Sequence, residues 1–177
     1  MKRNIQIVFV LIAILVFASV LSLKEDPFQQ GEKELVCSAP VTKKILSDIR
    51  PDRSSTHRTS FREQQENFNY CKNSTIAFQY AFRFDTDLMD KQDSIRVQTS
   101  AVNNCISKYN FLGYEPGKPD VRSEQLKATS QYLVFYGGIG VPYFTVDRKT
   151  LEVVKSDSKT YEFSCAVKYV AKQRNKI

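Results

Sequence analysis

The sequence lacks tryptophan and has a single histidine, so any catalytic set that needs a histidine base depends on one residue. A Ser-His-Asp or Cys-His triad would have to use His57, which lies in the polar segment 53–60. A catalytic base needs surroundings that hold and orient it, and no apolar periodicity flanks this histidine. We therefore predict an exposed loop histidine and a chain that is not an enzyme.

Cysteine is also scarce: the four residues are far apart and form no CxxC pair. Structural zinc sites place their ligands in close pairs, so this spacing argues against zinc. In an oxidising compartment, an even number of distant cysteines predicts two disulfide bonds. Three pairings are open, and the candidates are Cys37, Cys71, Cys105 and Cys165. We predict no metal site and no cofactor.

Long hydrophobic runs are missing except near the N-terminus, where residues 5–23 contain no charged side chain. A helix of this length, at about 1.5 Å per residue, roughly spans the hydrocarbon layer of a membrane. The same run fits a signal peptide that is cleaved after Ala18 or Ser22. Residues 1–24 are therefore interpreted as a signal peptide or a signal anchor.

The charges around this run predict the topology of the chain. Lys2 and Arg3 precede it and are expected to stay in the cytoplasm. The remainder is then periplasmic or otherwise extracytoplasmic, either free or anchored in the inner membrane through residues 5–23. Lys2, Arg3 and Lys24 account for three of the 26 basic residues, so 23 basic and 19 acidic residues remain, a net charge of +4. For such an exported body we predict a protein partner and no nucleic acid.

Beyond the N-terminal segment, the sequence divides into a short and a long part. Residues 25–36 are interpreted as a spacer, and residues 37–177 are predicted to form a single domain. At its start, a short helix with Ile45 and Ile49 on one face is expected to be capped by Ser38. The polar segment that follows predicts a surface loop or a polar helix.

Period-two alternation predicts several strands. From Ile76 to Phe84 aromatic residues alternate with smaller or polar ones, which favours a strand. The later segments with the same pattern are 132–136, 141–146, 151–155 and 161–170. In the last of them Cys165 shares a face with aromatic residues. We expect it to point into the core and tie the sheet to an earlier element.

Helical periodicity is strongest in residues 93–109, where Ile95, Val102 and Ile106 share one side of a helix. Combined with the strands, this helix predicts an α+β fold of the cystatin or NTF2-like type. One or two helices would pack on a curved antiparallel sheet, after the N-terminal hydrophobic helix.

A hairpin in residues 138–154 carries a family resemblance. It contains a Gly-Val-Pro-Tyr start, a strand, an Asp-Arg-Lys-Thr turn and a second strand. This segment resembles the terminal hairpin of the NTF2-fold immunity proteins and is similar to hairpins in PepSY-type inhibitory domains. No functional residue is carried over from the resemblance.

Export, predicted disulfides and few catalytic residues favour an exported envelope binding protein. Its expected role is that of an inhibitor or immunity protein that neutralises a toxin or a hydrolase. The alternatives are a membrane-anchored structural subunit of a secretion or conjugation assembly, and a small hydrolase. Tyr and Arg side chains are the expected anchors of a protein contact. The candidate contact residues are Arg53, His57, Arg58, Arg62, Tyr136, Ile139 and Tyr143.

Overall fold

The structure is a computed structural model that describes residues 28, 31–53, 60–89, 91–106, 115–138, 140–157 and 160–170. In chain order its elements are β1 Glu32–Pro40, α2 Lys43–Asp48, α3 Phe61–Asn73, β2 Ile76–Asp85, α4 Thr86–Met89, β3 Ile95–Asn103, β4 Pro119–Ala128, β5 Tyr132–Tyr136, β6 Pro142–Asp147, β7 Val153–Lys155 and β8 Ser164–Tyr169. Strands make up 48% of the described residues, so this part of the chain is mostly β.

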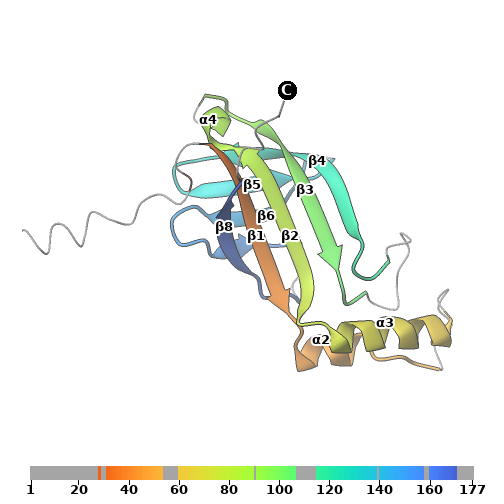
Figure 1. The fold of residues 1–177 in the computed structure, drawn as a ribbon. Coiled ribbons are helices and arrows are strands. Elements are labelled where there is room, and N and C mark those ends of the chain that lie inside the picture. The colour runs from red at the N-terminus through yellow and green to blue at the C-terminus, as the bar shows by residue number, and fades with distance from the viewer. Residues whose placement is uncertain are drawn as a thin grey trace, which may run out of the picture.

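The strands of the described residues form one eight-stranded antiparallel sheet, in the order β7-β6-β5-β4-β3-β2-β1-β8. The N-terminal strand β1 thus lies between β2 and the C-terminal strand β8. The two edges of the sheet meet at one point, because Glu152 beside β7 forms an antiparallel bridge with Ser164 of β8. The sheet is therefore curled into a nearly closed, barrel-like form (Figure 1).

The predicted α+β arrangement of the cystatin or NTF2-like type is wrong. Helices α2 and α3 lie at one end of the sheet instead of covering its face, and α4 is a short turn of four residues after β2 (Figure 1). A curled sheet can bury its apolar face against itself, so it needs no helical layer.

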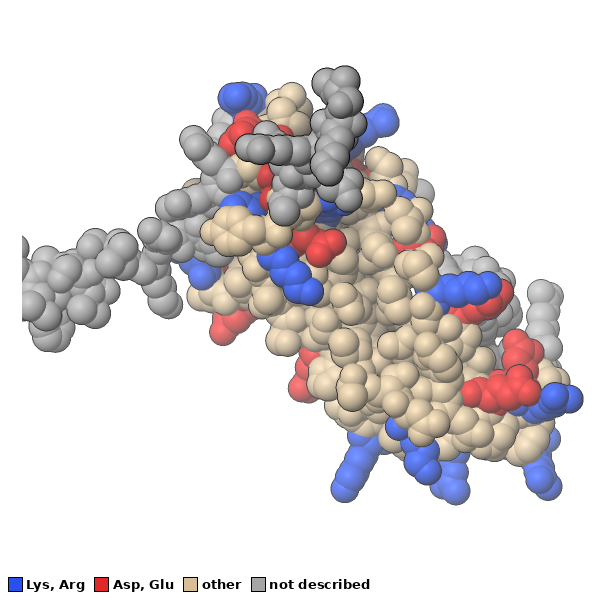
Figure 2. Space-filling model, viewed as in Figure 1, with Lys and Arg blue, Asp and Glu red and all other residues tan. Residues whose placement is uncertain are grey.

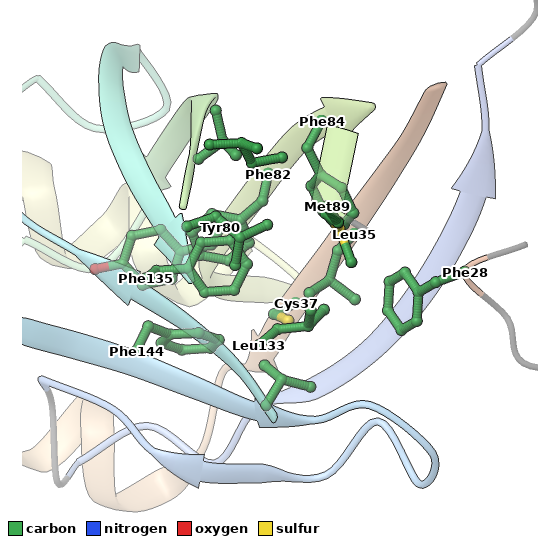
Figure 3. Packing of buried hydrophobic residues seen from close by; sticks show 14 residues of the cluster. Phe28, Leu35, Cys37, Tyr80, Phe82, Phe84, Met89, Leu133, Phe135 and Phe144 are labelled. Carbon is green, nitrogen blue, oxygen red and sulfur yellow. The ribbon is translucent and has the colours of Figure 1, made fainter. Parts of the chain in front are cut away.

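The core fills the inside of the curled sheet with aromatic and aliphatic side chains (Figure 3). Alternate residues of β2 point inward, so Tyr80, Phe82 and Phe84 are buried while Arg83 is exposed. Phe82 is fully buried and stacks on Phe135 of β5, with 3.8 Å between ring centroids. The strand predicted in this segment is confirmed, because its alternation reflects an inner and an outer face.

The four later strands predicted from alternation are also confirmed. Strand β5 has the predicted bounds, and β6, β7 and β8 begin one to three residues later than predicted. The helix predicted for residues 93–109 is wrong, because most of that segment forms β3. Ile95, Val97 and Thr99 are buried at alternate positions, and pairing with β2 and β4 on both sides holds the segment extended.

Helices α2 and α3 build a second, smaller core at the end of the sheet. Its buried residues are Ile45, Ile49, Cys71, Ala77 and Cys105. The predicted short helix is confirmed, but Thr42 caps it, since Ser38 belongs to β1. Lys and Arg side chains project from this end of the molecule (Figure 2). Lys43 and Lys44 of α2 are both exposed.

The N-terminal predictions are only partly within the described residues. Residues 32–36, interpreted as the end of a spacer, form the first half of β1, and Leu35 and Val36 are buried there. The hydrophobic helix predicted for residues 5–23 lies outside the described residues. No helix in the described part of the chain has the length and apolar character that a membrane crossing requires.

Both predicted disulfides are present, and the structure decides their pairing. Cys37 of β1 is bonded to Cys165 of β8, and Cys71 of α3 is bonded to Cys105 after β3. Cys37 and Cys165 are register partners on neighbouring strands, so Cys165 ties the sheet to an earlier element as expected. Two such bonds are typical of an oxidising, extracytoplasmic compartment.

Candidate functional site

A cavity of about 440 Å³, here called the main cavity, lies inside the curled sheet where β2 begins and β3 ends. Its walls come from several strands and combine aromatic rings with polar and charged side chains. They include Tyr80, Thr99, Glu124, Tyr143 and Asp157. Cavities that hold small ligands typically have volumes of about 300–1,000 Å³, so the main cavity is large enough for one.

The inward-facing residues of β3 and β4 explain why the interior is open at this end. Along β3 the inward row changes from Ile95 and Val97 to the smaller Thr99 and Ala101. Along β4 the inward position two residues before the fully buried Leu126 is occupied by Glu124. Small and charged side chains cannot fill the interior as the phenylalanines do at the other end, so a cavity remains.

Strand β4 also separates from β5 beside the main cavity. It pairs with β3 along most of its length but pairs with β5 only from Gln125 to Ala128. A second cavity of about 420 Å³ lies at this separation, and it shares Glu124 and Gly137 with the main cavity. Tyr136 is part of its wall. Glu124 therefore lies where two openings in the structure meet.

A β-bulge in β6 brings Tyr143 to the main cavity. The pairing of β5 with β6 shifts after Phe135, which pairs with Phe144, and this shift breaks the alternation at Tyr143. Both Tyr143 and Phe144 consequently pack near Tyr80, with ring centroids 5.8 and 5.1 Å from it. Bulges commonly redirect a side chain in this way, often beside a functional site.

Hydrogen bonds between hydroxyl groups and carboxylates connect the walls of the main cavity. The Tyr80 hydroxyl donates to Asp157 Oδ2 at 3.1 Å, and Asp157 lies in the connection between β7 and β8. The Tyr143 hydroxyl donates to Glu124 Oε2, and Thr99 Oγ1 donates to the same oxygen at 2.8 Å. One set of hydrogen bonds therefore joins β2 to the connection between β7 and β8, and a second set joins β3, β4 and β6 to one another.

The charged residues of the main cavity are predominantly acidic. Among the residues that the structure describes, its lining contains four carboxylates and two cations. Lys118 forms an ion pair with Glu115, and Arg122 forms one with Asp120 at 2.5 Å. These two pairs are formally neutral, so Glu124 and Asp157 leave a formal charge of −2 on the lining.

The two cavity tyrosines are held in their neutral form. Burial raises the pKa of Tyr80, and the negative charge of Asp157 raises it further. Burial also raises the pKa of Tyr143, and its hydrogen bond to Glu124 adds to this effect. Both hydroxyl groups therefore stay protonated and act as donors at physiological pH.

Alkaline pH is expected to destabilise the fold through these tyrosines. An unfolded tyrosine ionises near pH 10, whereas Tyr80 and Tyr143 have raised pKa values in the folded state. The unfolded chain therefore releases protons first, and the free energy of unfolding should fall as the pH rises above about 10. Urea unfolding at pH values from about 8 to 11 measures this slope. A Tyr80→Phe/Tyr143→Phe variant should have a shallower slope, and equal slopes would contradict the prediction.

The predicted contact residues are not brought together in one site. Tyr143 lines the main cavity and Tyr136 lines the second cavity. Arg53 and Arg62 lie at the start of α3, where the Arg53 guanidinium is 4.9 Å from the Phe61 ring centroid. His57, Arg58 and Ile139 lie outside the described residues.

The sequence pattern did not predict β4, which carries part of the acidic lining. The segment Pro119–Ala128 contains one buried residue, Leu126, so it has no apolar alternation. A usable signal was the recurrence of Asp120, Arg122 and Glu124 at every second position, in phase with Leu126. A charged row that continues an apolar one predicts a strand whose inner face becomes polar along its length.

The candidate site rests on its geometry alone. Within the described ranges, no group of His, Cys, Asp and Glu side chains could hold a metal ion. The resemblance of the 138–154 hairpin to immunity and inhibitory domains stays a prediction. Comparisons with known proteins found no matching family model, no matching curated protein and no matching solved structure.

Proposed function

We propose that this chain is an exported, non-catalytic binding protein that takes a small ligand into the main cavity. The observation that carries the proposal is a cavity of about 440 Å³ inside a disulfide-linked sheet. Aromatic walls with a few convergent polar groups are typical of small-ligand sites, because the rings supply contact area and the polar groups fix orientation. The apolar residues 5–23 and the two disulfides support export.

The way the polar groups are held supports binding. Tyr80, Thr99, Glu124 and Tyr143 lie on paired strands, which position side chains more rigidly than loops do. Hydrogen bonds between them restrict their side-chain rotation further. A site preorganised in this way loses little conformational entropy when a ligand binds.

The hydrolase alternative has less support from the same residues. It requires two buried carboxylates that face one cleft, with at least one environment that shifts the protonation of an acid. Glu124 is only partly buried and Asp157 is exposed, and each accepts a hydrogen bond from a tyrosine. These contacts suit a structural or ligand-binding role for both acids.

Inhibition of a protein partner is a second candidate function, favoured by the exposed rim of the main cavity. Val141 belongs to this rim and is 53% exposed. A partner protein that covers the opening of the cavity would bury this apolar side chain. Native mass spectrometry of the exported chain separates the two functions, because it distinguishes the small added mass of a ligand from that of a second chain.

Filling the main cavity tests the proposed function. Ala101 lines the cavity, so an indole placed there by Ala101→Trp should occupy the ligand's space. We expect the affinity for a neutral apolar dye, N-phenyl-1-naphthylamine, to fall at least about tenfold, as measured by dye fluorescence with the full chain.

The matched control is Val121→Trp on β4, where the replaced side chain is 54% exposed. It adds the same indole outside the cavity and should leave the affinity unchanged. The N-terminal apolar segment is present in both variants, so their difference isolates the cavity. Equal dye binding by the two variants would show that the main cavity holds no ligand.

A further inference from the structure

We propose, on the basis of the proposed function, that the ligand of the main cavity is a small organic ammonium ion. Its cationic nitrogen binds at the carboxylates of Glu124 and Asp157, and its apolar body packs against the rings of Phe78, Tyr80 and Tyr143. Charge, hydrogen-bond polarity and ring geometry support this assignment separately.

The charge of the lining favours a cation. Lys118 and Arg122 are paired with acids of the same cavity, so the carboxylates of Glu124 and Asp157 set its formal charge of −2. The exported body as a whole is basic, with 23 basic and 19 acidic residues after residue 24. The charge of the cavity lining is therefore opposite in sign to the net charge of the whole body, and the lining faces an open cavity.

The hydrogen-bond polarity of the lining favours a donor. Thr99 and Tyr143 donate their hydroxyl hydrogens to Glu124, and Tyr80 donates its hydroxyl hydrogen to Asp157. The hydrogen atoms of these hydroxyl groups are therefore already engaged in hydrogen bonds. The hydroxyl groups and the carboxylates can offer a ligand only the lone pairs of their oxygen atoms. A primary ammonium group has three N–H donors and no acceptor, so it matches these hydroxyl and carboxylate oxygens, whereas the cations Lys118 and Arg122 of the same lining are already paired with Glu115 and Asp120.

The aromatic wall suits the remainder of such a ligand. The ring centroids of Phe78 and Tyr80 are 4.8 Å apart, and those of Tyr80 and Tyr143 are 5.8 Å apart. These rings form a continuous surface beside the two carboxylates. Ring faces attract cations and also pack against apolar groups, so a nitrogen with an attached aromatic or aliphatic body satisfies both kinds of surface.

Three probes of matched size and different charge test the assignment by isothermal titration calorimetry with the full chain. They are 2-phenylethylamine, 2-phenylethanol and phenylacetate. We expect the amine to bind at least about tenfold more tightly than the alcohol, because charge-assisted hydrogen bonds are the stronger kind, and phenylacetate to bind most weakly. Added salt should weaken binding of the amine and leave that of the alcohol unchanged.

Glu124→Gln removes the charge and keeps a hydrogen-bond acceptor for Tyr143 and Thr99. It should lower the affinity for the amine about tenfold and leave that for the alcohol unchanged. The matched control is Glu152→Gln, which neutralises an exposed carboxylate outside the main cavity and should change neither affinity.

The outcomes separate this inference from the proposed function. Equal affinity for the amine and the alcohol, or tighter binding of phenylacetate, overturns the ammonium assignment and leaves a ligand-binding cavity in place. An amine affinity that Glu124→Gln does not change also overturns the assignment. Binding of none of the three probes at millimolar concentration overturns the ammonium assignment, and the proposed function is then decided by the dye measurement with Ala101→Trp. Tighter binding of a capped lysine peptide than of the amine would mean that the cavity binds a lysine side chain of a partner protein. That result would overturn the proposal that its ligand is a free small molecule.

Discussion

Replacing Cys37 and Cys165 together by alanine is expected to lower the free energy of unfolding by about 5 kcal/mol. The bond joins residues separated by 128 positions, and the entropy that a disulfide removes from the unfolded chain grows with the length of the closed loop. It also holds the closing edge of the sheet. Strand β8 pairs with β1 on one side, while a single bridge to Glu152 connects its other side to the described part of the sheet.

The matched control is the second disulfide, which joins Cys71 to Cys105 across 34 positions. Its removal by the same double substitution should cost about 4 kcal/mol, because the loop is shorter. Urea unfolding followed by far-ultraviolet circular dichroism measures both values in a chain without tryptophan. A smaller loss for the Cys37–Cys165 pair than for the Cys71–Cys105 pair would contradict the argument from loop length and edge closure.

Phe82→Ala is expected to lower the free energy of unfolding by about 4 kcal/mol. Phe82 is 0% exposed and stacks on Phe135, and its ring centroid is 5.4 Å from those of both Tyr80 and Phe144. Truncation removes these ring contacts and leaves a void inside the nearly closed sheet, where neighbouring strands cannot easily collapse into it. The packing that holds Tyr80 at the main cavity would loosen as well.

Phe61→Ala provides a control with the same chemical change. Phe61 begins α3 and is 37% exposed, so its removal should cost less than about 1 kcal/mol. Urea unfolding of the two variants compares a buried with a half-exposed phenylalanine. Similar losses would mean that the interior of the sheet relaxes around the missing ring, contrary to the tight packing seen around Phe82.

Local periodicity predicted strands but did not predict how they assemble. The alternation from Ile76 to Phe84 identifies β2, because the inner and outer faces of a strand leave a direct pattern in adjacent residues. The position of β1 between β2 and β8 leaves no such pattern, since it depends on pairing between the two ends of the chain. The expectation of helices covering the sheet was wrong for this reason: closure removed the open face that they would have covered.

The candidate site was only partly predictable from the sequence. Tyr143 was selected as an interface residue, but the β-bulge that turns it toward Tyr80 is a feature of strand pairing. Glu124 and Asp157 were missed because isolated acids in polar segments are usually solvated surface residues. They become part of one cavity only when β4 and the connection between β7 and β8 curl to the same end of the sheet.

The sequence alone determined three features: the hydrophobic segment 5–23, an even number of distant cysteines and the aromatic row of β2. Each of them depends only on composition or on neighbouring residues. Tertiary structure alone decided which cysteines pair, that the sheet curls until it is nearly closed and that its interior changes from apolar to acidic. These three properties depend on contacts between residues far apart in the chain. Such contacts are set by the packing and hydrogen bonding of the whole sheet, which leaves little trace in any single segment.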